Sequence, residues 1–433
     1  MREMISTNIQ WIPLIPAKWS IARMKDIIAI LTDYTANGSF GDLAKNVQYL
    51  DYEDYARLIR LTDLREQLKN AGVYVNEESY EYLSKSKLYG GEILVANVGA
   101  YAGLFCEMPE ANMPSTLGPN MFLIKTNDKM LQHFLLYLGN TSVVWEQLRQ
   151  KAISSAQPKL NKTDIKTTYI LIPPLSEQRH IADFLDTKCA EIDALTADIQ
   201  TQIDTLEQYK RSVITETVTK GLNPDAEMKD SGVFYMAPMN ASWQLTKIGY
   251  ICTKLSRSFV PEDIALICSN KGKVQVRADD LTGIMVSDDN AMQGIRTGDI
   301  AIHGMDTWHG AIALSEFDGK ITRVVHVCDS TEDKRFIVYY MQHLAFQGVY
   351  KLISNGVRGN TSDFRSWDKV RDIWIAIPKT RQEQKEICDY LDRQCNAVEE
   401  VISTKKQQLE VLTDYKKSLI FEYVTGKKEV PTS

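Results

Sequence analysis

The sequence has no long apolar run, no paired cysteines and no leader-like N-terminus. Its 433 residues include seven scattered cysteines, and none of them forms a C-x-x-C pair. That spacing offers neither a zinc site nor a disulfide framework, so we expect reduced cysteines in packed positions. No stretch approaches the length of a membrane span, and the opening MREMISTNIQ lacks the apolar core of a signal peptide. We therefore expect a cytoplasmic protein with no membrane partner.

A basic excess is also missing. The chain carries 50 Lys and Arg against 56 Asp and Glu, which gives a net charge of −6. Nucleic-acid-binding domains are usually basic, so this balance argues weakly against one, although local basic patches can still exist. The length and the hydrophobic content of 44% are those of a globular protein with two or three domains.

Catalytic signatures are the third absence. The chain has no G-x-x-x-x-G-K-[ST] phosphate loop, no H-E-x-x-H and no G-x-S-x-G. Ile172-Pro173-Pro174-Leu175 has the two prolines of an amino-methyltransferase motif but neither flank. Glu262 and Asp263 with Lys271 are the nearest match to a nuclease cluster, and their spacing is poor. We expect a protein without a catalytic site, and an enzyme with an unrecognised site is the alternative.

What the sequence does contain is an internal repeat. IPPLSEQRHIADFLD at 172–186 returns as IPKTRQEQKEICDYLD at 377–392, and 177–219 aligns with 383–425 at an offset of 206 positions. A repeat of this kind sets the architecture, so it takes precedence over local motifs.

Each copy predicts one long helix with an apolar residue every seven positions. Prolines 173, 174 and 378 prevent extension backwards, and glycines 221 and 426 end the two copies. Because a lone apolar stripe of this length is unstable in water, we expect the two helices to pair, in antiparallel fashion. The seam residues are Leu185, Ile192, Ile199, Leu206 and Val213 in the first copy and Leu391, Val398, Leu412 and Leu419 in the second.

Two further features of the seam are expected. Lys405 interrupts the second stripe, which predicts a turn that faces water or a partner chain. A second seam position is assigned to Ile181, Leu195 and Tyr209 in the first copy and to Ile387, Val401 and Tyr415 in the second.

The regions before the helices repeat more loosely. GEILVANVGAYAGLF from Gly91 and GDIAIHGMDTWHGAIA from Gly298 both predict a strand, a glycine-containing turn and a strand. The predicted class is α+β, with two globular domains and two long antiparallel helices in a pseudo-twofold tandem. The predicted boundaries are 1–172 for the first domain, 173–222 for the central helix, 223–376 for the second domain and 377–433 for the distal helix and tail.

Two kinds of segment in each domain are candidates for ligand contact. HGMDTWHG holds His303, Asp306 and His309, which could bind a metal. The aligned positions Ala96, Gly99 and Ala102 carry no ligand, so we predict no metal and a turn that differs between halves. Tyr101 and Trp308 in these turns are either contact residues or core aromatics.

The second kind is a locally basic, loop-like segment before the last strand, at 151–166 and 351–365. Its composition suits phosphate contact with hydrogen bonding to base edges, and a solvated surface loop is the alternative. The candidate DNA-binding residues of the first domain are Asn97, Tyr101, Lys151, Ser155, Gln157, Lys159 and Lys162. Those of the second domain are His303, Thr307, Trp308, His309, Lys351, Asn355, Arg358, Asn360 and Arg365.

With IPPLSEQ and IADFLD, IPKTRQEQ and ICDYLD, and the paired GEILV and GDIAI strands, the chain resembles the specificity (S) subunits of type I restriction–modification systems. The resemblance implies a non-catalytic subunit whose two domains each read one half of a bipartite site in double-stranded DNA. It implies that the helix pair fixes the gap and helps to dock two methyltransferase (M) subunits, with restriction (R) subunits joining the complex. S-adenosylmethionine, ATP and magnesium are implied for those partners only, and no cofactor for this chain. A coiled-coil scaffold whose domains bind proteins is the competing interpretation.

Overall fold

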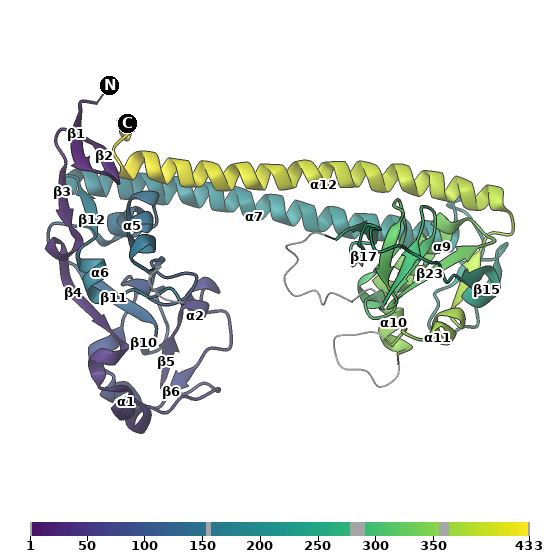
Figure 1. Ribbon diagram of the computed structural model, residues 1–433, viewed down its shortest axis with the longest axis horizontal. Coiled ribbons are helices and arrows are strands. Elements are labelled where there is room, and N and C mark those ends of the chain that lie inside the picture. The colour runs from purple at the N-terminus through teal and green to yellow at the C-terminus, as the bar shows by residue number, and fades with distance from the viewer. Residues whose placement is uncertain (1, 153–156, 278–290, 355–362, 432–433) are drawn as a thin grey trace. The chain divides into compact units, whose positions relative to one another are not determined.

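The computed structural model describes residues 2–152, 157–277, 291–354 and 363–431 (Figure 1). The chain divides into two compact units. The first unit comprises Met1–Asp198 and Gln408–Ser433, and the second comprises Ile199–Gln407. Each unit therefore holds one globular domain together with part of both long helices.

The first unit is built around two four-stranded sheets. One has the order β4-β11-β8-β9 and is antiparallel throughout. The other has the order β6-β5-β10-β7, in which β10 runs parallel to β5. The strands are β4 Ile28–Asp33, β5 Ala56–Ile59, β6 Tyr74–Val75, β7 Lys87–Leu88, β8 Ile93–Ala96, β9 Phe105–Glu107, β10 Ser115–Leu117 and β11 Met121–Thr126.

Two-stranded pairs and short helices complete the first domain. A hairpin at the N-terminal end joins β1 (Met4–Ile9) to β2 (Ile12–Pro16), and β3 (Ser20–Arg23) pairs with β12 (Tyr169–Ile172) just before the long helix. The helices are α1 Phe40–Asn46, α2 Leu61–Arg65, α3 Glu77–Tyr82, α4 Gln132–Gly139, α5 Ser142–Ala152 and α6 Lys162–Lys166.

The second unit repeats one of these sheets and replaces the other. Its four-stranded sheet has the order β16-β23-β20-β21, which matches β4-β11-β8-β9 strand for strand. The strands are β16 Cys252–Lys254, β20 Ile300–His303, β21 Ile312–Leu314 and β23 Val325–Ser330. The pair β15 (Gln244–Lys247) and β24 (Trp374–Ile377) corresponds to β3 and β12.

In place of the other sheet the second unit has two antiparallel pairs. They are β17 (Leu266–Ser269) with β18 (Lys273–Val276) and β19 (Met292–Ile295) with β22 (Gly319–Thr322). A last short pair in the linker joins β13 and β14. The remaining short elements are β13 Met228–Lys229, β14 Met239–Asn240, α8 Ile248–Ile251, α9 Lys334–Phe346, α10 Val349–Leu352 and α11 Trp367–Arg371.

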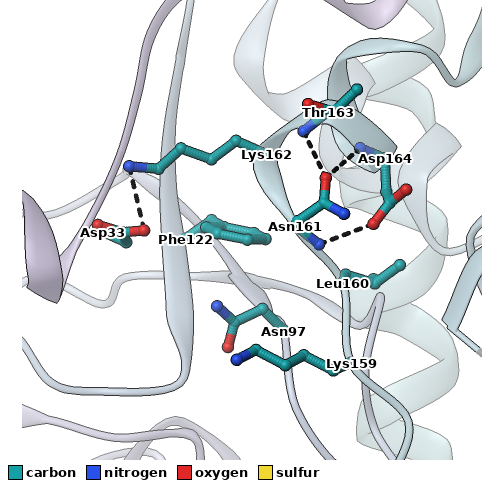
Figure 2. Close-up of a pocket in the computed structure, with 9 residues that line it drawn as sticks. All are labelled: Asp33, Asn97, Phe122, Lys159, Leu160, Asn161, Lys162, Thr163 and Asp164. Atoms are coloured by element: carbon teal, nitrogen blue, oxygen red, sulfur yellow. Dashed lines mark hydrogen bonds and ion pairs between the residues drawn. The ribbon is translucent and has the colours of Figure 1, made fainter. Parts of the chain in front are cut away.

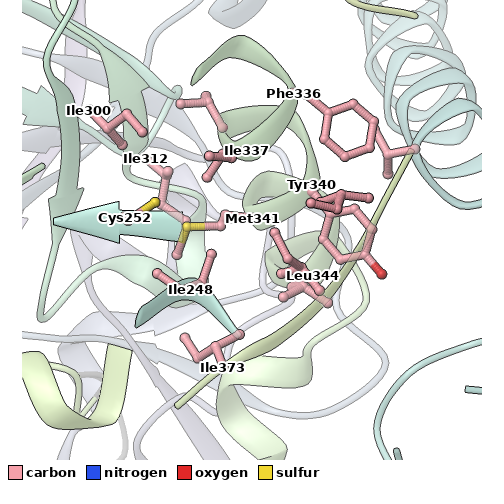
Figure 3. Close-up of a cluster of buried hydrophobic side chains, with 14 of the residues drawn as sticks. Ile248, Cys252, Ile300, Ile312, Phe336, Ile337, Tyr340, Met341, Leu344 and Ile373 are labelled. Atoms are coloured by element: carbon pink, nitrogen blue, oxygen red, sulfur yellow. The ribbon is translucent and has the colours of Figure 1, made fainter. Parts of the chain in front are cut away.

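Apolar side chains from sheet, helix and long helix share one core in each unit. In the second unit, α9 lays Phe336, Ile337 and Met341 against Ile300 and Ile312 of the sheet (Figure 3). All five side chains are fully buried. The predicted α+β class is confirmed, as are the strand–turn–strand segments around Asn97 and Trp308.

The two long helices are α7 (Leu175–Lys220) and α12 (Arg381–Val424), drawn in teal and yellow in Figure 1. The predicted stops are confirmed: α7 follows Pro174 directly, and Gly221 and Gly426 take left-handed φ values of +87° and +70° just past the helix ends. A residue with a Cβ would be strained there, which is why glycine is favoured.

Within the first unit the two helices run antiparallel. Phe184 packs on Tyr423 with ring centroids 4.6 Å apart, and Lys416 Nζ lies 2.6 Å from Asp193 Oδ1. Numbers therefore fall along α12 as they rise along α7.

The second unit shows the same direction of pairing. Lys210 Nζ lies 2.5 Å from Glu399 Oε1, and the Lys405 ammonium group donates to the Gln202 side chain across the helix pair. The Lys405 turn faces water, as predicted, since its neighbours 403, 404 and 406–408 are exposed, and the lysine in addition reaches the neighbouring helix.

Most of the predicted seam is buried. Leu185, Ile192, Ile199, Leu391, Val398 and Leu419 are buried, while Leu206, Val213 and Leu412 are half-buried. The assignment of the second seam position holds at the start of each helix, where Ile181 and Ile387 are buried, and is wrong further along. Leu195, Tyr209, Val401 and Tyr415 are exposed there, and the buried residues lie on the opposite side of the stripe, at Cys189, Ile203, Cys395 and Ile402.

In each domain a tryptophan forms a hydrogen bond with the start of the long helix that follows the domain. Trp19 Nε1 donates to Glu177 at 2.8 Å, and Trp243 Nε1 donates to Glu383 at 2.8 Å. The two glutamates are the repeat-equivalent residues of the Glu-Gln pairs seen in the sequence. The sequence repeat is therefore a repeat of contacts as well.

The glutamine that follows each glutamate is fully buried. Gln178 Nε2 donates to the Pro173 carbonyl at 2.8 Å, and Gln384 Nε2 donates to the Pro378 carbonyl at 3.1 Å. Each amide thus satisfies a carbonyl that the proline-containing turn leaves free at the helix start.

A tyrosine of each domain makes a third repeated contact, further along the long helix. The Tyr137 hydroxyl donates to Asp186 at 2.7 Å, and the Tyr339 hydroxyl donates to Asp392 at 2.7 Å. These aspartates end the IADFLD and ICDYLD motifs. The motifs are therefore docking sites for the preceding domain.

Candidate nucleic-acid interface

In the first unit, two of the predicted segments lie against each other. The turn after β8 and the segment around Lys159 form an isolated bridge between Val98 and Lys159. Gly99 N donates to the Pro158 carbonyl at 2.8 Å, and Leu160 N donates to the Asn97 carbonyl at 2.8 Å. Residues 97–99 and 158–160 thus form one surface, although about sixty positions separate them in the sequence.

An open hollow of about 610 Å³ lies at this surface (Figure 2). Lys162 Nζ lies 3.0 Å from Asp33 Oδ2, so one cation is held at its side. The Asn97 Oδ1 atom is buried and accepts no hydrogen bond from the described residues. The lining residues are Asp33, Asn97, Phe122, Lys159, Leu160, Asn161, Lys162, Thr163 and Asp164.

The prediction that residues 151–166 form a loop is wrong at both ends. Residues 162–166 form helix α6, whose first turn is capped by Asn161: its Oδ1 accepts from Thr163 N at 2.8 Å and from Asp164 N at 3.0 Å. Asp164 in turn accepts from Asn161 N at 2.8 Å. This reciprocal cap fixes the position of Lys162 at the rim of the hollow.

Lys151 has a different environment from the other candidates. It lies in the last turn of α5, and Nζ donates to the Asp164 carbonyl and to the hydroxyls of Thr167 and Thr168, all at about 3 Å. Burial lowers the pKa of this ammonium group. Its three donors are occupied by internal acceptors, so Lys151 holds α5 to α6 in this conformation.

Tyr101 is a surface residue with a neighbour that the sequence did not indicate. Its ring is 43% exposed, which decides against a core role. The Arg65 guanidinium lies over the ring at 4.4 Å from the centroid. Arg65 belongs to α2, some forty positions earlier in the chain, and nothing in the local sequence marks it as a neighbour of this turn. Gln157 is exposed as well.

In the second unit the turn after β20 is organised by His303. Its Nδ1 accepts from Asp306 N at 3.1 Å, and burial lowers the pKa of the imidazole. The Asp306 carboxylate lies 3.2 Å from the same nitrogen. Thr307 is 1% exposed, and His309 is exposed. No group of three potential metal ligands occurs in the part of the chain that the structure describes.

Trp308 is half-buried and meets the second basic segment. The Lys351 ammonium lies over its ring at 5.5 Å from the centroid, and Trp308 Nε1 donates to Ser354 Oγ at 3.3 Å. Arg365 contacts the Met305 sulfur from the far end of that segment. The turn and the segment thus come together in this unit too. Ser155, Asn355, Arg358 and Asn360 lie outside the described residues.

The family described as "Type I restriction modification DNA specificity domain" matches residues 16–205. The protein named "Putative type I restriction enzyme MjaX specificity subunit" of Methanocaldococcus jannaschii is 23% identical, over 96% of this chain and 95% of its own length. The MjaVIII specificity subunit of the same organism is 20% identical over 96% and 94%.

Among solved structures, one on complex assembly and conformational transition of the type I R-M system contains a similar chain. The TM-score is 0.66 at 15% identity, over 96% of this chain and 99% of that one, which shows a shared fold. The resemblance stated from the sequence is confirmed. In the described residues no helix combines the length and apolar character needed to cross a membrane.

Proposed function

We propose that this chain, a relative of type I restriction–modification specificity subunits along almost all of its length, is the sequence-specific DNA-binding subunit of such an enzyme. It is not itself catalytic. Residues 1–172 and 223–376 are target-recognition domains, and each reads one half of a bipartite site in double-stranded DNA. The helices within 173–222 and 377–433 set the gap between the halves.

One observation supports this more than any other: a shared scaffold carries different loops. The four-stranded sheet, the β3·β12 and β15·β24 pairs and the three helix-junction contacts occur in both units. The second sheet of the first unit has no counterpart of the same strand order in the described part of the second. Two domains that read different half-sites need this combination, because base contacts specify the DNA sequence while the shared scaffold positions the contacting loops on the duplex.

Apart from Lys151, whose ammonium group is occupied internally, and the buried Thr307, the candidate contact residues become the proposed DNA-binding set, with Lys159 and Lys162 as phosphate contacts and Asn97 as a base reader. Asparagine pairs with the N6 and N7 atoms of adenine, and the half-buried Asn97 lines the hollow together with Lys159 and Lys162. Trp308, His309, Lys351 and Arg365 are the corresponding set in the second domain.

The exposed apolar residues of the helix pair support a docking role. The first unit exposes Leu195 and Tyr415, and the second exposes their repeat equivalents Val401 and Tyr209, each at 45–54%. Equivalent apolar surface in both units suits two copies of one partner, the methyltransferase subunit. Restriction subunits join through that complex, and S-adenosylmethionine, ATP and magnesium belong to the partners.

A matched insertion tests the gap-setting role. One seven-residue heptad is added to each helix where the units meet, after Asp198 and after Gln407. Seven residues preserve the apolar period of both seams, so the helices still pair. The expected result is a methylated site with both half-sequences unchanged and a longer gap.

The control carries the heptad in α7 alone, which puts the two seams out of register. We expect that variant to lose pairing and activity. A double insertion that methylates the original gap at the original rate contradicts the gap-setting role.

A further inference from the structure

The described residues contain three non-glycine positions with positive φ, and all three lie in the first domain. They are Gln67 at +52°, Leu68 at +61° and Asn120 at +67°. Side chains rarely adopt this conformation, and each instance costs about 1 kcal/mol or more unless its surroundings fix it. Such positions concentrate at functional sites, which makes this part of the first domain a candidate site that the repeat does not indicate.

A buried polar network fixes the loop that holds Gln67 and Leu68. Arg57, 8% exposed, donates from Nη1 to the Leu68 carbonyl at 2.8 Å and from Nη2 to Asn70 Oδ1 at 2.5 Å. Asp63 has no exposed surface, and its carboxylate accepts from Asn70 Nδ2 at 2.8 Å. Burying an arginine and an aspartate is costly unless they are paired, and here Arg57 Nη2 lies 3.7 Å from Asp63 Oδ1 while the buried Arg57 Nε has no partner among the described residues. The two side chains therefore hold the shape of this short loop at a cost in stability.

The loop presents hydrogen-bonding side chains to solvent. Arg65, Gln67 and Lys69 are all exposed, and Glu66 lies between them. Arginine and lysine pair with guanine and glutamine with adenine in the major groove, while a glutamate can accept from cytosine. A loop that only joins β5 to β6 requires neither a strained backbone nor this set of exposed hydrogen-bonding side chains, so the two together indicate a binding role.

Backbone contacts join this loop to the turn that carries Asn97 and Tyr101. Gly118 N, just before the third strained position, donates to the Ile59 carbonyl at the end of β5, at 2.8 Å. Asn97 N donates to the Asn120 carbonyl at 3.1 Å. With Arg65 stacked on Tyr101, the three segments 59–70, 97–101 and 118–120 therefore share one edge of the domain.

We infer that residues 65–69, from the last residue of helix α2 into the loop that follows it, form a base-reading segment of the first domain, held by Arg57 and Asp63 and acting beside Asn97 and Tyr101. Arg65 and Gln67 read base edges, and Lys69 contacts phosphate. This inference rests on the proposed DNA-recognition function and adds to it a specificity loop that lies outside both sequence repeats.

The test uses the full chain co-purified with its methyltransferase subunit. The methylated motif is first mapped with the unaltered chain, and binding is then measured with duplexes in which each base pair of that motif is changed in turn. Gln67→Gly removes the side chain and keeps the positive φ without strain, whereas alanine would confound the two. Arg65→Ala removes the guanidinium, and Lys18→Ala, on an exposed lysine beside the Trp19 junction, is the matched loss of one charge.

Gln67→Gly and Arg65→Ala are expected to weaken binding to the intact motif about tenfold or more. Both are expected to lose discrimination at one or two positions of a single half-site. The other half-site and the Lys18→Ala variant are expected to be unchanged. Unchanged specificity, or equal loss at both half-sites, overturns the inference. If the unaltered chain gives no gapped motif at all, the proposed function itself fails, which is a distinguishable result.

Discussion

The two units are most alike where each domain meets the long helices and least alike in the loops that carry the proposed contacts. At the junctions, Trp19 with Glu177 and Trp243 with Glu383 have the same donor, the same acceptor and the same 2.8 Å distance. In the loops, a strained turn after α2 in the first domain stands against the β17–β18 hairpin in the second. A duplicated helix scaffold under one set of constraints explains the first result, and two different half-sites explain the second.

The β17–β18 hairpin adds one contact that distinguishes the second helix junction. Lys273 Nζ lies 2.5 Å from Glu399 Oε2, and Glu399 also pairs with Lys210. The repeat-equivalent pair in the first unit, Lys416 with Asp193, involves one lysine only among the described ion pairs. The domains are thus anchored by common contacts and then adjusted individually.

The largest effect is expected from two substitutions that test whether the two helix junctions contribute equally to the free energy of unfolding. Leu185→Ala and Leu391→Ala each remove a fully buried seam residue at equivalent repeat positions. Each is expected to lower the free energy of unfolding of its unit by about 2–5 kcal/mol, because both leave a cavity. Denaturant unfolding followed by hydrogen exchange in each unit measures this.

Leu195→Ala is the control for that comparison, since its side chain is 47% exposed and is expected to change stability by less than about 0.5 kcal/mol. If one seam leucine had a large effect on stability and its repeat equivalent almost none, the two copies of the repeat would not contribute equally to stability.

Lowering the pH is expected to destabilise the second unit more than the first. Burial lowers the pKa of His343 in the second unit to about 4, and it also lowers the pKa of His303 and His326. In the first unit burial acts on His133 in the same direction, but the Glu107 and Asp186 carboxylates outweigh it and raise the pKa. A lowered histidine pKa means that the unfolded chain binds the proton first as the pH falls below about 6.5.

The second unit should therefore lose stability between about pH 6.5 and 4, by roughly 2 kcal/mol at pH 5 from His343. The His133 contribution to the first unit is instead present below about pH 6.5. Unfolding of each unit at pH 7.5 and pH 5 tests the difference, and His343→Gln should reduce it. An equal or larger loss in the first unit contradicts this assignment.

The smallest expected effect concerns the added hairpin contact. Lys273→Ala should lower the stability of the second unit by about 1 kcal/mol or less, because the ion pair lies at the surface. Lys271→Ala, on an exposed lysine two positions earlier in the turn between β17 and β18, is the control and should have no effect. Differential scanning calorimetry at low and high salt measures both. A loss that persists unchanged in high salt would mean that Lys273 acts through packing and not through charge.

The sequence predicted the features that local patterns and the repeat control. Proline and glycine fixed the ends of α7 and α12, and seven-residue spacing placed Leu185 and Leu391 in the seam. It did not predict which side of that stripe meets the neighbouring helix. Apolar residues occur on both sides, Leu195 on one and Ile203 on the other, so only the partner's surface decides.

The proposed contact residues were predictable only in part, for the same reason. A basic composition pointed to Lys151, but its ammonium is occupied by carbonyl and hydroxyl oxygens that come close only through the packing of α5 on α6. Arg65 was missed because its place beside Tyr101 depends on the meeting of two loops distant in the sequence. Left-handed backbone at Gln67 and Leu68 has no sequence signature, since neither residue type favours it.

The most direct test of the central claim is a map of modified bases in a host that carries this gene with its methyltransferase partner, compared with the same host after deletion of this gene alone. The account predicts a bipartite, gapped methyl-adenine motif that is present in the first and absent from the second. An unchanged set of methylated motifs after deletion, with the methyltransferase still produced, would contradict it.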